Sequence, residues 1–320
     1  MTRRAALLAL VLFASGCSKP HAAPTSSDGA ALAAMTLALD WVPEPEFGGF
    51  YAARESGAFA RRGLDVTIQG GGAGVPVVQM VASGKVQLGL AGADEVLTAR
   101  ARGADVIPVF ATFQTSPQGI MAHASRGAKT MADVLSSGTL SLEPGLPYAA
   151  FLKKKFGFGK VSIVPYDGGV ARFMVDKSFA QQCYVTSEPI AAKKRGGDPQ
   201  VFLVADEGYN PYLGVVIVGR ANFDAHRAEV RAFVEAAREG WKNYLANPAP
   251  TNTVLQQLNP AMDGETLAGA ADAERKLIAP EGGPEIGSMT RERWETLGKQ
   301  LVELGILEKA PDVGAFLLAP

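Results

Sequence analysis

The sequence has little of what most catalytic sites need. It contains two cysteines and three histidines, and no Cys/His pair has the spacing of metal ligands. It has neither the Gly-x-Ser-x-Gly motif of a nucleophilic serine nor the Gly-Lys-Ser/Thr of a phosphate-binding loop. These absences argue against metal and nucleophilic catalysis, so we expect a protein without metal, cofactor or chemical step.

The charge balance and the apolar runs argue against two further classes. The formal net charge is −1 and the basic residues are scattered, which is not typical of a surface that binds nucleic acid. Beyond the N-terminus, no apolar run of the sequence is long enough to span a bilayer. We therefore expect a soluble body that binds no nucleic acid.

The N-terminus has the features of an export signal. Two arginines precede an apolar run over residues 5–13, which is too short to cross a bilayer as a helix. Small residues then lead to Cys17, an order that resembles a bacterial lipoprotein signal; the alternative is an ordinary secretory signal with an incidental cysteine. We expect a signal peptide over 1–16, a flexible tether over 17–35 and a lipid anchor at Cys17. That places the protein in the periplasm or at the outer face of the cell membrane.

From residue 36, strand and helix patterns alternate, which predicts parallel sheets with crossover helices. Two such series meet at polar crossings near 112–120 and 206–213, and a helical tail follows. This organisation predicts an α/β protein of two lobes with a cleft between them. The predicted lobes are 36–117, continued over 213–320, and 118–212. The tail is predicted to contain a long helix over 225–245 and a last helix over 312–318.

A glycine-rich stretch over 70–74 follows a predicted strand, and Asp94 lies twenty residues beyond it. The third glycine comes one position too early for a dinucleotide-binding Gly-x-Gly-x-x-Gly. We interpret the stretch as a tight turn that lends backbone N–H groups to a cleft.

Acids and aromatics gather in the loops after the predicted strands, where open α/β sheets bind ligands. Arg172 is the one obvious cation nearby, whereas a sulfonate, nitrate or phosphate site would supply basic groups. Carboxylates with aromatics suit a flat ligand that bears N–H donors, or a cation. Alternatively, each acid stabilises the N-terminus of a helix instead of contacting a ligand. Tyr51 alternatively belongs to the core. The candidate binding residues are Asp40, Trp41, Glu44, Phe47, Tyr51, Asp94, Ser116, Glu143, Tyr148 and Glu188.

Three stretches resemble one family of binding proteins. They read LDWVPEPEFGGFYAARESGAFARRGLDVTI, GKVQLGLAGADEVLTARARG and VTSEPIAA. They are similar to thiamine-pyrimidine-precursor-binding proteins, which are related to the alkanesulfonate- and nitrate-binding proteins of ABC importers. The resemblance covers most of 36–220. It implies a two-lobe type II periplasmic-binding fold, and a pyrimidine site lined by Asp40, Trp41, Tyr51, Asp94 and Glu188.

Two positions depart from the family pattern: Glu44 stands where the family has Asn, and Phe47 where it has His. We predict that these positions hold the specificity. The function implied is that of a monomeric solute-binding protein that delivers a small, amino-bearing ring compound to an ABC permease and its ATPase. A flavin or an alkanesulfonate-like anion is an alternative ligand, and a pyrimidine synthase-like enzyme is an alternative function.

Overall fold

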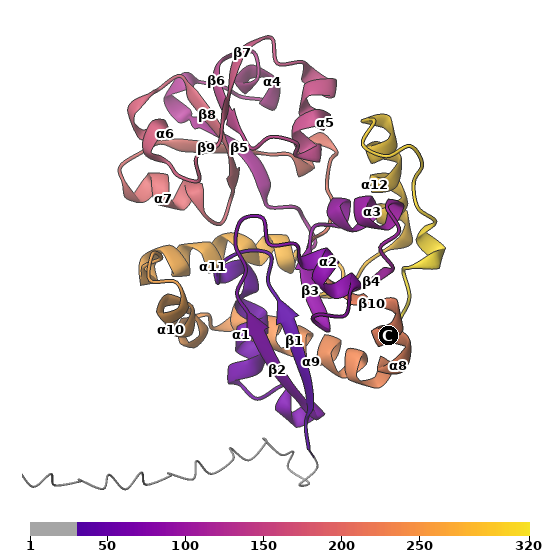
Figure 1. Ribbon diagram of the computed structural model, residues 1–320. Helices are drawn as coiled ribbons and strands as arrows, with labels where there is room; N and C mark the ends of the chain where they lie inside the picture. Colours follow the sequence, from indigo (N-terminus) through magenta and orange to yellow (C-terminus); the bar gives the residue numbers. More distant parts are fainter. Residues whose placement is uncertain (1–30) are drawn as a thin grey trace, which may run out of the picture.

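The computed structural model describes residues 31–320, and the strands in these residues form two sheets (Figure 1). The predicted signal peptide, Cys17 and most of the predicted tether lie outside the described residues. In the first sheet the strand order is β2-β1-β3-β10-β4, and β10 is antiparallel to both its neighbours. Its strands are β1 (Ala33–Ala38), β2 (Leu64–Gln69), β3 (Leu88–Ala91), β4 (Val106–Phe113) and β10 (Leu213–Gly219).

The second sheet has the order β7-β6-β8-β5-β9, with β5 antiparallel to β8 and β9. The chain reaches it between Phe113 and Gln118 and returns between Leu203 and Leu213. We call these two connections the crossing segments. The strands of this sheet are β5 (Gln118–His123), β6 (Ser137–Leu142), β7 (Lys160–Pro165), β8 (Phe179–Tyr184) and β9 (Pro199–Leu203).

Each sheet with its helices forms one lobe, and Figure 1 shows the second lobe above the first. The helix α11 lies at the boundary, where it contacts α7 of the second lobe. The first lobe contains α1 (Gly48–Glu55), α2 (Val77–Ala82), α3 (Ala93–Ala101), α8 (Arg220–Ala225), α9 (Arg227–Ala246), α10 (Ala249–Leu258), α11 (Gly264–Ile278) and α12 (Arg291–Glu303). The second contains α4 (Met131–Val134), α5 (Pro147–Phe156), α6 (Ala171–Val175) and α7 (Glu188–Lys194).

Helices cover both faces of the first sheet. Side chains alternate along a strand, so Val216 and Val218 of β10 face the core formed with α1 and α9, while Val215 and Ile217 face the core formed with α2, α3 and α12. All eight residues of β4 are buried, as expected for a strand covered on both sides. Pro108 is tolerated there because β4 is the last strand of its sheet.

The Gly48-Gly49 pair allows α1 and α9 to pack closely. A Cβ on Gly49 would overlap the Trp241 ring, and a Cβ on Gly240 would overlap the Gly49 carbonyl oxygen. The approach positions Phe50 edge-on against Trp241, with ring centroids 5.8 Å apart. This packing fixes the helix that follows the first strand-end loop.

The structure corrects two predictions for the tail. The helix predicted over 225–245 is two helices, α8 and α9, because His226 has non-helical dihedral angles (φ −132°, ψ 39°). The helix predicted over 312–318 is a single 3-10 turn, Val313–Ala315, in which Asp312 accepts from the Gly314 N–H at 2.9 Å. Across the described residues, every helix is too short or too polar to traverse a bilayer.

Candidate functional site

A cavity of about 580 Å³ lies between the lobes, and we call it the cleft. The first lobe lines it with Asp40, with part of α2, and with residues along α3 and just beyond its end. The second lobe lines it with Gln118, Leu146-Pro147 and Tyr184. The cleft lies at the carboxyl ends of β1, β3 and β8, where ligands bind in open α/β sheets.

The loop after β1 is held in place by the glycine-rich stretch. The Gly71 N–H donates to the Trp41 carbonyl oxygen at 2.9 Å, and a Cβ on Gly71 would overlap the Leu39 carbonyl oxygen. The Gly71 N–H is therefore bonded to the loop after β1 and does not face a ligand, contrary to our prediction for this stretch. The loop presents Asp40 to the cleft and leaves the Trp41 side chain 44% exposed.

Asp94 enters the cleft from the first turn of α3. Its Oδ1 accepts from the Glu95 N–H at 3.0 Å, and its Oδ2 accepts from the Tyr209 O–H at 3.4 Å. Burial raises the pKa of Asp94, and these hydrogen bonds oppose that effect. The Glu95 contact is the interaction expected of an acid at a helix N-terminus. Asp94 thus has both of the roles that we considered from the sequence, since it also lines the cleft.

Glu188 is the first residue of α7, and partners from other segments hold its carboxylate. It accepts from the Tyr166 O–H and, at 2.8 Å, from the Tyr184 N–H. Burial raises its pKa, and both hydrogen bonds oppose the rise. Its charge also acts across the cleft, because it is one cause of the raised pKa of Glu44 in the first lobe.

Glu143 and Tyr148 are joined through Gln182. The Gln182 Oε1 accepts from the Glu143 N–H at 2.6 Å and from the Tyr148 O–H at 3.4 Å. The Glu143 side chain is exposed, whereas Tyr148 is 3% exposed and packs in the core. The ring of Tyr148 is therefore covered by protein in this structure.

Acidic groups near the cleft have raised pKa values. Burial raises the pKa of Asp40 to about 6. Burial, with repulsion from Glu188, raises that of Glu44 to about 7, and a contact with the Trp41 side chain opposes this. Burial raises the pKa of Glu46 well above its usual range, and Glu44, Asp40 and Glu188 add to the effect. Within residues 31–320, none of these four acids forms an ion pair.

Of the ten predicted binding residues, Asp40 and Asp94 line the cleft itself. Three others lie in the interior of the fold. Phe47 and Tyr51 are 2% and 1% exposed and belong to the core of the first lobe. Ser116 is fully buried in a crossing segment, where its N–H donates to Asn210 Oδ1 of the other crossing segment at 2.8 Å. Arg172 also lies elsewhere, because its guanidinium covers the Phe179 ring at 5.1 Å.

The structure adds residues that the sequence did not single out. Gln118, Tyr184 and Arg102 line the cleft, and Arg102 is exposed. Tyr184 could have been found, because it ends a strand in the same way as the predicted residues. Arg102 lies at the end of a helix and carries no comparable signal.

Arg293 of α12 holds the crossing segments together. Its Nη1 donates to the Gln114 carbonyl oxygen at 2.6 Å, and its Nε donates to the Asn210 carbonyl oxygen at 2.8 Å. Its Nη2 donates to Asn210 Oδ1 at 2.9 Å and to the Pro211 carbonyl oxygen at 3.1 Å. One guanidinium thus contacts both connections between the lobes.

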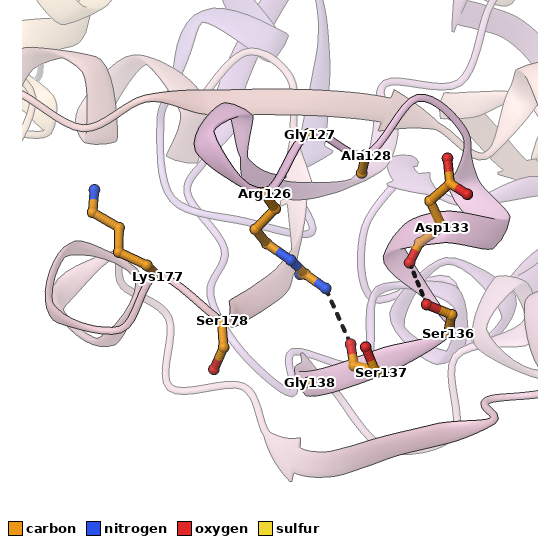
Figure 2. Close-up of a pocket in the computed structure, with 9 residues that line it drawn as sticks. All are labelled: Arg126, Gly127, Ala128, Asp133, Ser136, Ser137, Gly138, Lys177 and Ser178. Atoms are coloured by element: carbon orange, nitrogen blue, oxygen red, sulfur yellow. Dashed lines mark hydrogen bonds between the residues drawn. The ribbon is translucent and has the colours of Figure 1, made fainter.

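A second cavity, of about 550 Å³, lies in the second lobe away from the cleft (Figure 2). It is next to the start of β6, and its Arg126 already donates to the Ser137 carbonyl oxygen at 3.0 Å. No predicted residue lines it, and it lies at the amino end of a strand. The described residues contain no group of three or more His, Cys, Asp or Glu placed to hold a metal ion.

Comparisons with known proteins agree with this geometry. A family model described as "NMT1/THI5 like" matches residues 44–251. The formylaminopyrimidine-binding protein of Halalkalibacterium halodurans is 27% identical over 258 residues, which are 78% of this chain and 76% of that protein. The riboflavin-binding protein RibY of Chloroflexus aurantiacus is 25% identical over 269 residues, 81% of this chain and 75% of that protein.

A solved structure shares the architecture. The periplasmic aliphatic sulphonate binding protein SsuA from Escherichia coli matches with a TM-score of 0.70 and 15% identity, over 90% of this chain and 92% of that one. This likeness confirms the two-lobe type II periplasmic-binding fold that the sequence resemblance implied.

Proposed function

The chain belongs to the NMT1/THI5-like family, and from that premise we propose that it is the solute-binding component of an ABC importer. Its ligand is a small ring compound that bears amino groups. The ligand contacts both lobes, is enclosed when they close about the crossing segments, and is delivered in the closed form to a permease with its ATPase. The two units that close are the lobes proposed from the sequence. Residues 36–117 together with 213–320 form one lobe, and residues 118–212 form the other.

One observation carries the proposal: the cleft is lined from both lobes, with carboxylates on one side and Tyr184 and Gln118 on the other. A cavity of about 580 Å³ is within the range of small-molecule sites, roughly 300–1,000 Å³. The names of the two relatives support a ring compound. Binding needs no chemical step, and we propose that the protein acts as a monomer. The lipid anchor at Cys17 is supported by the N-terminal sequence.

The ligand class can be tested by thermal shift with an aminopyrimidine, riboflavin, a polyamine and an alkanesulfonate. A ligand in excess of its Kd raises the melting temperature, because it binds the folded state alone. We expect the aminopyrimidine to stabilise the protein and the alkanesulfonate to have no effect. Stabilisation by the sulfonate alone would contradict the proposal. Recovery of chemically altered ligand would favour the enzymatic alternative.

Glu188→Gln tests the site itself. The carboxylate accepts hydrogen bonds from an N–H-bearing ligand more strongly than an amide does, so we expect affinity to fall by about tenfold. Isothermal titration calorimetry measures the change. Glu55→Gln removes one charge from an exposed residue at the end of α1 and should leave affinity unchanged. Equal affinity of wild type and Glu188→Gln would remove Glu188 from the site.

A further inference from the structure

The acids around the cleft come from separate elements of both lobes. Asp40 and Glu44 follow β1, Asp94 lies in the first turn of α3, and Glu188 begins α7 in the second lobe. No ion pair within residues 31–320 involves any of them. Among the described residues that line the cleft, Arg102 is the one basic side chain, and it is exposed. Closure of the lobes therefore brings like charges together with little internal compensation.

The protein interior behind these acids holds a further acid, Glu274 of α11, whose raised pKa is opposed only by the charge of Arg275. The charge on Glu46 adds to the effect of burial in raising the pKa of Glu274. Glu274 is 0% exposed, and in the described part of the chain neither of its carboxylate oxygens has a hydrogen-bond partner. Buried carboxylates are normally paired or hydrogen-bonded. Among residues 31–320, Glu274 is thus an acid without a hydrogen-bond partner close to Glu46.

The cleft wall also has an unused acceptor. Gln118 Oε1 is buried and has no hydrogen-bond partner among residues 31–320. Opposite it, the carboxylates of Asp40 and Asp94 are acceptors when ionised. A ligand that meets these groups must bring N–H donors. The carboxylates are not grouped as metal ligands in the described residues, which favours an organic ligand over a metal ion.

We propose that the cleft takes its ligand as an organic cation with several N–H donors, such as an amidinium or a protonated aminoheterocycle. This inference rests on the proposed solute-binding function and adds the charge of the ligand to it. The cation compensates the charges of Asp40 and Asp94, which line the cleft, and of Glu44 and Glu188 nearby. Closure then becomes favourable because one positive charge lies between several negative ones.

A matched series of one-ring probes tests the charge. Benzamidine is a cation, benzamide is its neutral counterpart, and benzenesulfonate is an anion. We expect calorimetry at about pH 8 to show benzamidine binding at least tenfold more tightly than benzamide, and benzenesulfonate not binding. Benzamidine should bind more weakly at about pH 6, because the carboxyl groups of the cleft regain protons there.

The variant Glu44→Gln should lower the affinity for benzamidine by about tenfold and leave the affinity for benzamide unchanged. The control Glu55→Gln should alter neither affinity. Equal affinity for benzamidine and benzamide, or no binding of benzamidine, overturns the inference. If that happens while an aminopyrimidine or riboflavin still stabilises the protein, the solute-binding function stands without a cationic ligand. If no probe of either series binds, both proposals fail.

Discussion

At the scale of single residues, Glu274 is the acid most fully removed from water. It is 0% exposed, and burial raises its pKa well above the usual range, with a further rise from Glu46. As the pH rises, the folded protein therefore retains the proton on Glu274 after the unfolded chain has released it. Because the folded state binds more protons, the free energy of unfolding falls as pH rises above the unfolded pKa, which is about 4.3 for a glutamate.

We expect Glu274→Gln to reduce this pH dependence. Between about pH 5 and pH 8 the wild type should lose more stability than the variant, by about 1.4 kcal/mol for each unit by which the folded pKa is raised within that range. Urea unfolding at several pH values measures the two slopes. The control Glu281→Gln, at an exposed position, should have the same dependence of stability on pH as the wild type. A slope unchanged in Glu274→Gln would show that Glu274 stays ionised in the folded protein.

At the scale of elements, the contact between α1 and α9 depends on the absence of side chains. A Cβ on Gly49 would overlap the Trp241 ring, which is itself fully buried. We expect Gly49→Ala to destabilise the protein by about 1–3 kcal/mol through overpacking. The melting temperature should fall by several degrees. Gly72→Ala is the matched control, because no atom lies within 4 Å of a Cβ at Gly72; an equal loss in both variants would contradict the packing explanation.

The order of the elements could be predicted from sequence because buried strands form short apolar runs between turn signals. The strand Leu213–Gly219, with the sequence LGVVIVG, is a run of this kind. The acids after the strands could be expected near the cleft for the same topological reason, and Asp40 and Asp94 do line it. Phe47 could not be placed in this way, because a loop aromatic beside a helix packs inward or outward according to its tertiary neighbours. Glu274 could not be found either, since an acid on an amphipathic helix is normally exposed.

At the scale of the whole molecule, the closure that we propose depends on the crossing segments. They run antiparallel to each other in chain direction and are joined by the Ser116–Asn210 hydrogen bond. Residues Gln114 and Thr115 are also tied to the tail, because both N–H groups donate to the Leu277 carbonyl oxygen at 2.8 and 2.9 Å. The α12 helix adds Arg293, whose guanidinium lies 3.8 Å from the Tyr212 ring centroid. The tail thus helps to hold the crossing segments, which form the proposed hinge, although it lies outside the part of the chain that carried the family resemblance.

Arg293→Lys should loosen this hinge while it keeps the positive charge. An ammonium group cannot reproduce the planar fork that reaches acceptors in both crossing segments, so carbonyl groups of Gln114 and Asn210 lose their donor. We expect faster amide hydrogen exchange in 113–118 and 204–213, with little change in the two sheets, and ligand affinity lowered several-fold because the closed form is less populated. Arg291→Lys, at an exposed position of α12 that pairs with Glu295, should match the wild type. If exchange rose equally throughout both lobes, Arg293 would support overall stability and not the hinge.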